Sequence, residues 1–342
     1  MKTVCLSTQD LTIGYPNGGR VLADHLNLSL NAGELVCLLG VNGAGKSTLM
    51  RTFAGMQPPL AGDVYVDGVR VSRRGSAELA RKVSIVLTDK LDAGMMTARE
   101  LIALGRFPYT DWLGRLKSDD IEAVHQAIQN VGAEALADRR VNDLSDGERQ
   151  KIMIARALAQ DTPVMILDEP TAFLDVPRRA EIMQMLRRLA HTLDRAVLLS
   201  THDLDLALRC ADRLWLMRED GRIEVGAPED LVLSGAFQAA FDETGMRFDA
   251  ATGAFSIPSE VKGNVRLLGS GARLEWTRRA LERADYRIDP QAANEITVLN
   301  DLWRGKLEGV IYEWRSLAEV VDGLRSSTEA ARRQAAPLLS SN

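Results

Sequence analysis

The chain has 342 residues, of which 46% are hydrophobic and 26% charged, and its formal net charge at pH 7 is -5. This composition is typical of a folded globular protein and argues against wholesale disorder. A net negative charge and few aromatic residues argue against an extended basic surface for binding nucleic acid, so we expect no nucleic-acid partner. The length suits one large domain with an appendage or two medium domains, and we take two as the working expectation.

The cysteines and the lengths of the apolar runs indicate in which cellular compartment the chain works. Three scattered cysteines without CxxC spacing argue against a disulfide framework or a structural zinc site and favour a reducing cytosol. The first residues lack the apolar core of a secretion signal, and no apolar run reaches the length needed to cross a bilayer. If the protein works at a membrane, we expect another chain to span it.

The alternation of residue types predicts an α/β core. Residues 6–30 alternate apolar and polar side chains around a Pro-Asn-Gly-Gly turn, which favours antiparallel flanking strands. Four later apolar runs, mostly separated by segments of helical period, predict buried strands of a largely parallel sheet. These runs span 34–40, 83–87, 164–169 and 196–202. Because ligands bind beyond the carboxyl ends of parallel strands, we expect the functional groups at one edge of the sheet.

The first predicted domain also contains a helical insertion at about 95–160. Within it, residues 118–132 combine an N-cap, an acidic first turn, an apolar stripe and a C-terminal glycine. A predicted hairpin over 246–258 and a linker over 259–264 follow the core. We therefore place the first domain at 1–261.

The remaining residues, 262–342, alternate strand and helix patterns and predict a small α/β accessory domain of unknown role. Gly269 and Gly271 form a partial dinucleotide fingerprint, but Leu274 occupies the position of the third glycine. Docking, regulation and an inert scaffold therefore stay open as roles, and dinucleotide binding is the weakest of the alternatives.

A glycine-rich motif predicts a phosphate site. Residues 40–48, GVNGAGKST, fit G-x-x-x-x-G-K-[ST] between an apolar strand and a helix. The glycines let backbone N–H groups face a β-phosphate, Lys46 places a charge near the β- and γ-oxygens, and Ser47 can ligate Mg²⁺. The alternative is a glycine turn that only joins strand to helix. We expect ATP and Mg²⁺ here, with nucleotide contacts from Gly40, Asn42, Gly43, Gly45, Lys46, Ser47 and Thr48.

An acidic pair at the end of the third apolar run predicts the hydrolytic chemistry. Asp168 is suited to hold the Mg²⁺ water shell, and Glu169 to orient and deprotonate an attacking water. Alone, such a pair could equally cap a strand. Beside the glycine-rich motif, we interpret Asp168 as a metal ligand and Glu169, with Lys46, as catalytic.

Four motifs together resemble the nucleotide-binding domains of ABC ATPases. They are the glycine-rich motif, LSDGERQ at 144–150, ILDEP at 166–170 and STHD at 200–203, and the resemblance runs from the start of the chain to about residue 258. It implies a P-loop NTPase fold of ABC type. The signature of this family is usually written LSGGQ, so Asp146 and Glu148 depart from it.

The resemblance also implies a homodimer that shares its nucleotides. Ser145 and Gly147 of one subunit would close over the γ-phosphate bound at Lys46 of the other, although a Ser-x-x-Glu helix cap is the alternative use of this turn. Further residues match family positions. Tyr15 would stack on adenine, His202 would contact the γ-phosphate and align Glu169, Asp175 would reach across the dimer, and Thr88 stands where the family usually has Gln.

These residues have simpler interpretations as well. Tyr15 could be a core or hairpin tyrosine, His202 a structural histidine and Asp175 a helix cap. Thr88 is shorter than Gln, so a water, Asp89 or Lys90 would have to take over its role, or turnover would be slow.

Residues 100–120 resemble the corresponding stretch of ATPases that serve importers of ferric siderophores, haem and cobalamin. This implies an ATP-hydrolysing subunit at the cytoplasmic face of the inner (plasma) membrane, held there peripherally by a polytopic permease that docks on the helical insertion. A substrate-binding protein would be an indirect partner. The alternatives are a soluble non-transport ABC ATPase and an ATP-gated clamp with little hydrolysis.

Overall fold

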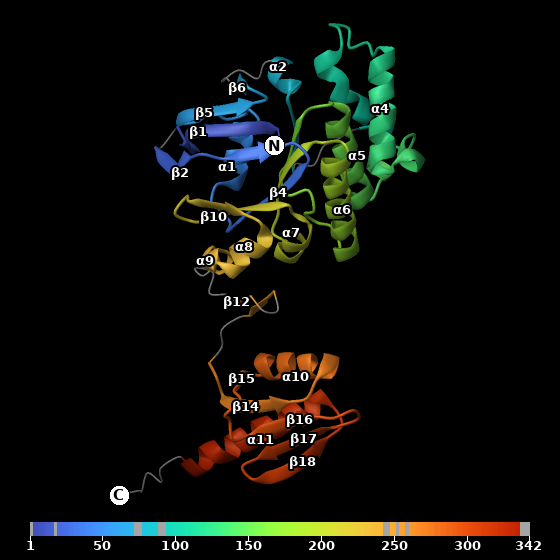
Figure 1. The fold of residues 1–342 in the computed structure, drawn as a ribbon. Coiled ribbons are helices and arrows are strands. Elements are labelled where there is room, and N and C mark those ends of the chain that lie inside the picture. The colour runs from blue at the N-terminus through green and yellow to red at the C-terminus, as the bar shows by residue number, and fades with distance from the viewer. Residues whose placement is uncertain are drawn as a thin grey trace, which may run out of the picture. The chain divides into compact units, whose positions relative to one another are not determined.

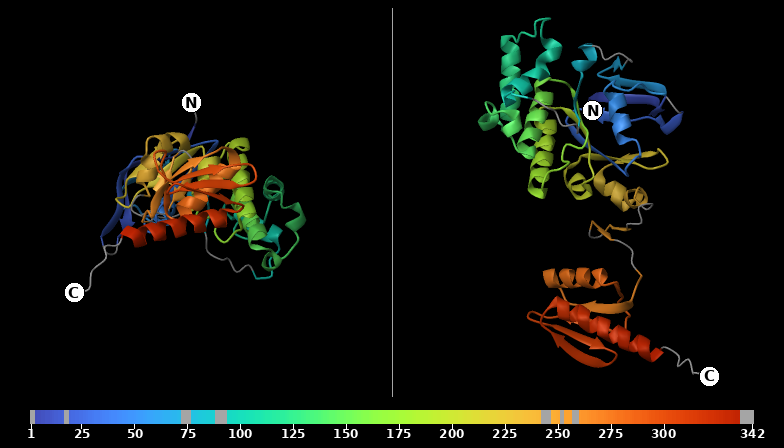
Figure 2. Two further views of the ribbon diagram at one scale, coloured as in Figure 1. Left: turned by 90° about the horizontal axis from the view of Figure 1, so that it is seen from below. Right: turned by 180° about the vertical axis from the view of Figure 1, so that it is seen from behind.

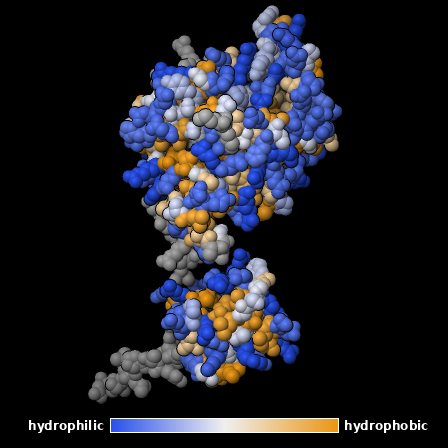
Figure 3. All heavy atoms as spheres, viewed as in Figure 1, coloured by the Kyte–Doolittle hydropathy of each residue, from blue (hydrophilic) through white to orange (hydrophobic). Residues whose placement is uncertain are grey.

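The protein divides into two compact units, Met1–Ser256 and Ile257–Asn342 (Figure 1). The predicted domain ranges, 1–261 and 262–342, stay predictions. The computed structural model describes residues 3–16, 19–71, 77–87, 94–241, 247–250, 253–256 and 260–335. Among these residues, no helix is both long enough and apolar enough to cross a bilayer. The faces shown in Figure 3 mix hydrophilic residues with smaller apolar groups in both units.

A six-stranded sheet with the order β11-β10-β4-β9-β8-β7 forms the centre of the first unit. All neighbours are parallel except β11, which pairs antiparallel with β10, so the predicted largely parallel core is confirmed. Every residue of β4, β8 and β9 is buried, as their continuous apolar runs predict. The strands are β4 Glu34–Gly40, β7 Val83–Val86, β8 Val164–Leu167, β9 Ala196–Ser200, β10 Arg213–Met217 and β11 Ile223–Gly226.

Alternate residues of β4 enter two separate hydrophobic cores. Leu35, Cys37 and Leu39 pack with the helical insertion, whereas Val36 and Leu38 pack with α1 and the antiparallel flank. Figure 1 shows α4, α5 and α6 on one side of the sheet and α1 with β1 and β2 on the other. The core helices are α1 Lys46–Phe53, α2 Ala77–Ala80, α6 Val176–Thr192, α7 Leu204–Cys210, α8 Pro228–Leu233 and α9 Ala236–Ala239.

The predicted antiparallel flank is a five-stranded sheet in which β1 pairs with β2, β3 and β5, and β5 pairs with β6. Its strands are β1 Val4–Tyr15, β2 Arg20–Leu26, β3 Ser29–Asn31, β5 Ala61–Val66 and β6 Val69–Arg70. The hairpin from β1 to β2 places Tyr15 directly opposite Arg20. A second predicted hairpin is formed by β12 Arg247–Asp249 and β13 Ala254–Ser256.

The helical insertion is built from three α-helices and three short 3₁₀ segments in the described chain. Thr97 and Glu100 form a capping box at the start of α3, and Gly132, with φ 65°, ends α4 in the left-handed conformation. Helix α5 packs against α3 and α4. The elements are α3 Ala98–Ala103, η1 Leu104–Tyr109, α4 Ser118–Val131, η2 Glu134–Leu136, η3 Val141–Asp143 and α5 Asp146–Ala159.

In its described residues, the second unit is a five-stranded sheet with the order β15-β14-β16-β17-β18 and two helices. Helices α10 and α11 contact one another and lie over the same face of this sheet (Figure 2). Gly305 lies against Trp314 in the core: a Cβ added at Gly305 would lie 2.2 Å from a ring atom of Trp314. The elements are β14 Gly263–Leu268, α10 Gly271–Arg283, β15 Tyr286–Ile288, β16 Glu295–Val298, β17 Trp303–Leu307, β18 Val310–Trp314 and α11 Leu317–Ala335.

Candidate active site

A cavity of about 320 Å³ opens where β4 ends and α1 begins. Gly45 precedes α1 in the left-handed conformation and provides no side-chain cap, so the first N–H groups of the helix can serve an anion. Gly40 has φ 156°, and a Cβ there would lie 2.3 Å from the Met217 carbonyl oxygen, so only glycine fits. The lining residues are Tyr15, Arg20, Leu22, Asn42, Gly43, Gly45, Lys46, Ser47, Thr48 and Glu169.

Lys46 is fixed by its own loop. Its Nζ donates to the Gly40 carbonyl at 2.7 Å and to the Val41 carbonyl at 3.1 Å, and the residue is only 7% exposed. Burial lowers the pKa of the Lys46 ammonium, while the Glu169 and Asp168 carboxylates oppose that shift. A phosphate at the mouth of this loop would meet a buried, oriented positive charge.

Tyr15 lies at the side of the cavity formed by the β1–β2 hairpin. Its ring is half exposed, and its hydroxyl accepts a hydrogen bond from Thr48 Oγ1 at 3.4 Å. The neighbouring residues Arg20 and Leu22 also line the cavity, and sequence reasoning missed both. The predicted hairpin could have indicated Arg20, because the residue that pairs with Tyr15 across a short turn must lie in the same surroundings.

Asp168 follows β8 and is held from the neighbouring strand β9. Its Oδ1 accepts a hydrogen bond from Ser200 Oγ at 2.7 Å, and that same hydroxyl oxygen accepts the Glu169 backbone N–H at 2.9 Å. Ser200 therefore orients both acidic residues. Sequence reasoning did not single it out, although it is the first residue of the STHD motif.

Glu169 and His202 meet at the edge of the cavity. A Glu169 carboxylate oxygen lies 2.8 Å from His202 Nε2, and Glu169 itself lines the cavity. The Glu169 backbone has φ 50°, a left-handed conformation that costs a non-glycine residue of order 1–3 kcal/mol. The parallel strands β8 and β9 thus bring together two residues that are 33 positions apart in the chain.

Residues 145–148, which we call the signature turn, and Asp175 form helix caps within the single chain. Ser145 and Glu148 form a capping box at the start of α5, and the Asp175 carboxylate accepts the Arg178 N–H at the start of α6. The cavity lining includes neither Ser145, Gly147 nor Asp175. Their predicted contact with a partner's nucleotide therefore stays a prediction, and Thr88 lies outside the described residues.

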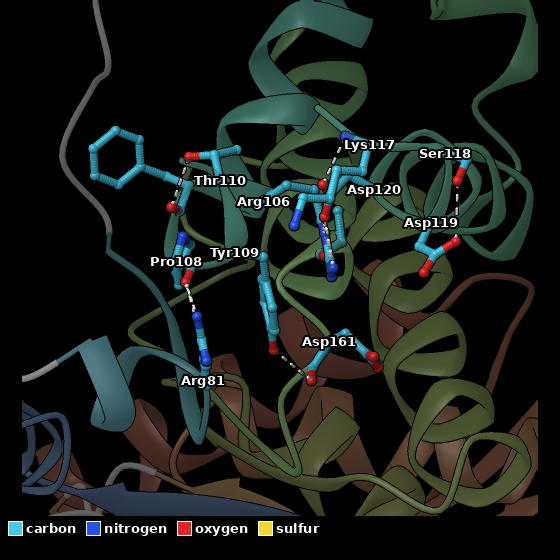
Figure 4. A network of polar contacts seen from close by, with 12 residues as sticks. Arg81, Arg106, Pro108, Tyr109, Thr110, Lys117, Ser118, Asp119, Asp120 and Asp161 are labelled. Atoms are coloured by element: carbon cyan, nitrogen blue, oxygen red, sulfur yellow. Dashed lines mark hydrogen bonds and ion pairs between the residues drawn. The ribbon is translucent and has the colours of Figure 1, made fainter. Parts of the chain in front are cut away.

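A buried ion pair anchors the helical insertion (Figure 4). Arg106 Nε and Nη2 each lie 2.9 Å from Asp120 Oδ1, and both side chains are less than 10% exposed. Burial acts to raise the pKa of the Asp120 carboxyl, but the Lys117 N–H and the Arg106 guanidinium outweigh it, so the pKa is lowered. The Arg106 guanidinium also lies 3.9 Å from the centre of the Tyr109 ring.

The stretch of the insertion that contains this ion pair, residues 104–121, also exposes large apolar side chains. Trp112 is 90% exposed and Phe107 is 74% exposed. We refer to the following residues as the insertion set: Leu104, Phe107, Trp112, Leu113, Leu116 and Ile121. Charged residues, among them Asp111, Arg115 and Lys117, are interspersed with them in the sequence. Where such side chains gather into one patch, they mark a protein-docking surface.

Comparisons with known proteins identify the family. A family model described as "ABC transporter" matches residues 23–172, and one described as "Iron ABC transporter C-terminal domain" matches residues 262–325. An ABC transporter ATP-binding protein of Methanocaldococcus jannaschii is 38% identical over 79% of this chain and 94% of its own length. The chain belongs to the ABC transporter ATP-binding proteins. The predicted family and P-loop NTPase fold are therefore confirmed.

Further relatives of this ABC protein are named for their cargo. The achromobactin transport ATP-binding protein CbrD of Dickeya dadantii is 37% identical over 69% of this chain and 87% of its own length. The cobalamin import ATP-binding protein BtuD of Halobacterium salinarum is 41% identical over 70% of this chain and 60% of its own length. A solved dimeric bacterial ABC transporter cassette is 26% identical, with a TM-score of 0.56, over 65% of this chain and 98% of its own.

Proposed function

We propose that this ABC protein binds and hydrolyses ATP to power a membrane importer of a ferric siderophore or a related metal chelate such as haem or cobalamin. The observation that carries the hydrolysis is the Glu169–His202 contact beside the buried Lys46. The choice of cargo is supported by relatives named for achromobactin and cobalamin transport.

In this proposal ATP occupies the cavity at the start of α1. The backbone N–H groups of 43–48 and the Lys46 ammonium bind the β- and γ-phosphates, and the Tyr15 ring stacks on adenine. A charge-assisted hydrogen bond contributes about 1.5–3 kcal/mol, so several of them suffice to hold the nucleotide. The side of the cavity with Arg20 and Leu22 would surround the ribose and base.

The residues also fit Mg²⁺. The Ser47 hydroxyl lines the cavity, and the Asp168 carboxylate is buried and oriented by Ser200, which together give the oxygen donors that Mg²⁺ prefers. When bound, Mg²⁺ would neutralise charge on the phosphate oxygens.

Glu169 acts as the general base in this mechanism. Its carboxylate takes a proton from the attacking water, which adds to the γ-phosphorus while the bond to the β–γ bridging oxygen breaks. His202 Nε2 holds the carboxylate in position at 2.8 Å, and Ser200 fixes the Glu169 backbone. The products are ADP and phosphate.

We further propose that two copies share their nucleotides. Ser145 and Gly147 of one copy would close over the γ-phosphate at Lys46 of the other, with Asp175 close to the same interface. Support comes from the dimeric state of the solved cassette to which this chain is similar and from the exposure of Ser145 and Asp146 at the start of α5. Loss of the γ-phosphate would release the two copies.

The insertion set is the proposed docking surface for a polytopic permease at the cytoplasmic face of the inner membrane. Its exposed aromatic side chains suit a hydrophobic partner helix, and the Arg106–Asp120 pair anchors the segment that carries them. Because the permease spans the membrane, this chain would sit there peripherally. A substrate-binding protein would act with the same assembly from the other side.

Three experiments test the proposal. Affinity purification of the full chain from membranes should recover a polytopic membrane protein, and phosphate release should rise in its presence. Uptake of iron chelates, haem and cobalamin should then be compared in a strain with and without this protein. Unchanged uptake of all three cargo classes would contradict import of metal chelates, and absent phosphate release would contradict hydrolysis.

A further inference from the structure

The signature turn carries two acidic residues, although in the proposed function it must bind a negatively charged phosphate. Asp146 and Glu148 stand beside Ser145 and Gly147, which would approach a partner's γ-phosphate. Like charges repel, and they do so more strongly in an interface from which water is excluded than in bulk water. A turn of this composition therefore needs compensation if two copies are to close around ATP.

The Glu148 carboxylate is held by two residues. Its Oε2 accepts hydrogen bonds from the Ser145 backbone N–H and from Ser145 Oγ, both at 2.8 Å. Its Oε1 accepts a charge-assisted hydrogen bond from Arg139 Nη1 at 3.1 Å. The Ser145 N–H, the Ser145 hydroxyl and the Arg139 charge lower the pKa of the Glu148 carboxyl, which therefore stays ionised at neutral pH.

Arg139 is itself oriented for this contact. Its second terminal nitrogen, Nη2, donates to the Asp143 carbonyl at 2.8 Å, so the guanidinium connects Glu148 to the segment that precedes the signature turn. Asp146 is compensated less directly, because it is 65% exposed and lies 3.8 Å from Arg149. The carboxylate that points back at Ser145 is thus the one that receives a charge-assisted hydrogen bond from an arginine, and that arginine is fixed in turn by the Asp143 carbonyl.

We propose that Arg139 is a positioning residue for the shared ATP site: it holds and neutralises the Glu148 carboxylate, so that an acidic signature turn can accept a partner's γ-phosphate. This inference rests on the proposed function. In the isolated chain the Ser145 hydroxyl hydrogen is directed at Glu148. On dimer closure it turns to the γ-phosphate, and Arg139 together with the Ser145 N–H keeps Glu148 in place.

The test compares ATP-dependent dimers of full-length variants. Six chains carry Glu169→Gln to slow hydrolysis: the parent, Arg139→Gln, Arg139→Lys, Glu148→Gln, the double variant Arg139→Gln/Glu148→Gln, and Arg140→Gln. Arg140→Gln removes the neighbouring exposed arginine and is the matched control for net charge. The measured quantity is the ATP concentration that gives half-maximal dimer by sedimentation velocity, with ATP binding to the monomer followed by fluorescent-nucleotide titration.

Arg139→Gln should raise the half-maximal ATP concentration by about tenfold or more, because the Glu148 carboxylate loses its hydrogen-bonded countercharge beside the phosphate. Adding Glu148→Gln should restore it to within about threefold of the parent, since no charge then needs compensation. Arg140→Gln should change little, Arg139→Lys should retain part of the effect of arginine, and monomer binding should be unaltered.

Four results would overturn the inference. An unchanged midpoint in Arg139→Gln, or an equal loss in Arg140→Gln, would show that Arg139 has no specific role. Failure of Glu148→Gln to rescue Arg139→Gln would indicate structural damage in place of charge compensation. If the parent forms no dimer at any ATP concentration, the proposed function fails first, and the role of Arg139 fails with it.

Discussion

The buried Arg106–Asp120 pair makes the most quantitative prediction about the stability of the first unit. Asp120→Ala leaves the Arg106 guanidinium without its carboxylate in a site where Arg106 is 7% exposed. Breaking a buried ion pair from one side costs about 3–5 kcal/mol. For a unit of this size, each kcal/mol lowers the melting temperature by about 2–4 °C, so we expect a decrease of roughly 6–20 °C.

Differential scanning calorimetry of the full chain measures this change. The matched control is Asp138→Ala, which removes the carboxylate from the exposed pair with Arg99, where side-chain exposure is 84% and 48%. That variant should melt within about 2 °C of the parent. Equal melting temperatures for the Asp120 and Asp138 variants would refute the argument that burial makes the first pair structurally essential.

The same pair predicts a pH dependence. The pKa of Asp120 is lowered in the folded state, so its contribution is fully present above the ordinary carboxyl pKa of about 3.9. It is lost as the pH falls through the lower folded-state value. The difference in stability between the parent and Asp120→Ala should therefore be constant from pH 5 to 7 and shrink below about pH 4. A difference that grows on acidification would contradict this sign.

Three further predictions concern the nucleotide site and the second unit. Glu169→Gln should retain ATP binding but lose roughly a hundred- to ten-thousand-fold in phosphate release, and normal turnover would refute its role as base. Lys46→Ala should weaken ATP binding by roughly 10- to 150-fold in fluorescent-nucleotide titrations, and undiminished affinity would contradict the phosphate site. Gly305→Ala forces a Cβ against Trp314 and should destabilise the second unit by about 1–3 kcal/mol in calorimetry, whereas an unchanged unfolding transition would argue against this close packing.

Much of the fold could be predicted because the buried elements have strong patterns. The core strands β4, β8 and β9 are continuous apolar runs, and each predicted strand lies where the sequence indicated. No pattern in the sequence was assigned to β5, β6, β10 or β11 of the first unit, or to β15 or β17 of the second. Strand β15 has only three residues, and β17 contains Trp303-Arg-Gly-Lys-Leu307, in which a glycine adapted to Trp314 weakens the strand pattern.

The site residues also divide into those that the sequence predicts and those that it does not. Motifs that are local in sequence, such as residues 40–48, could be found because their spacing fixes their geometry. Leu22 and Ser200 could not, because they enter the site through pairing with other strands, whereas Arg20 could have been inferred from the predicted hairpin that places it opposite Tyr15. Family resemblance suggested roles for Ser145 and Asp175, but within one chain both act as helix caps. A role that depends on a second copy leaves no trace in the contacts of the first.

Mixing two defective chains tests the sharing of ATP most directly. One carries Lys46→Ala, and the other Gly147→Asp, where a Cβ meets only ordinary contacts with Arg178 but the new carboxylate would repel a γ-phosphate. Both also carry Glu169→Gln, and neither should form an ATP-dependent dimer alone. If ATP is shared, a mixed pair has one intact site, so the mixture should give dimers that retain one ATP per pair. A mixture that forms no more dimer than either chain alone would contradict a nucleotide held between two copies.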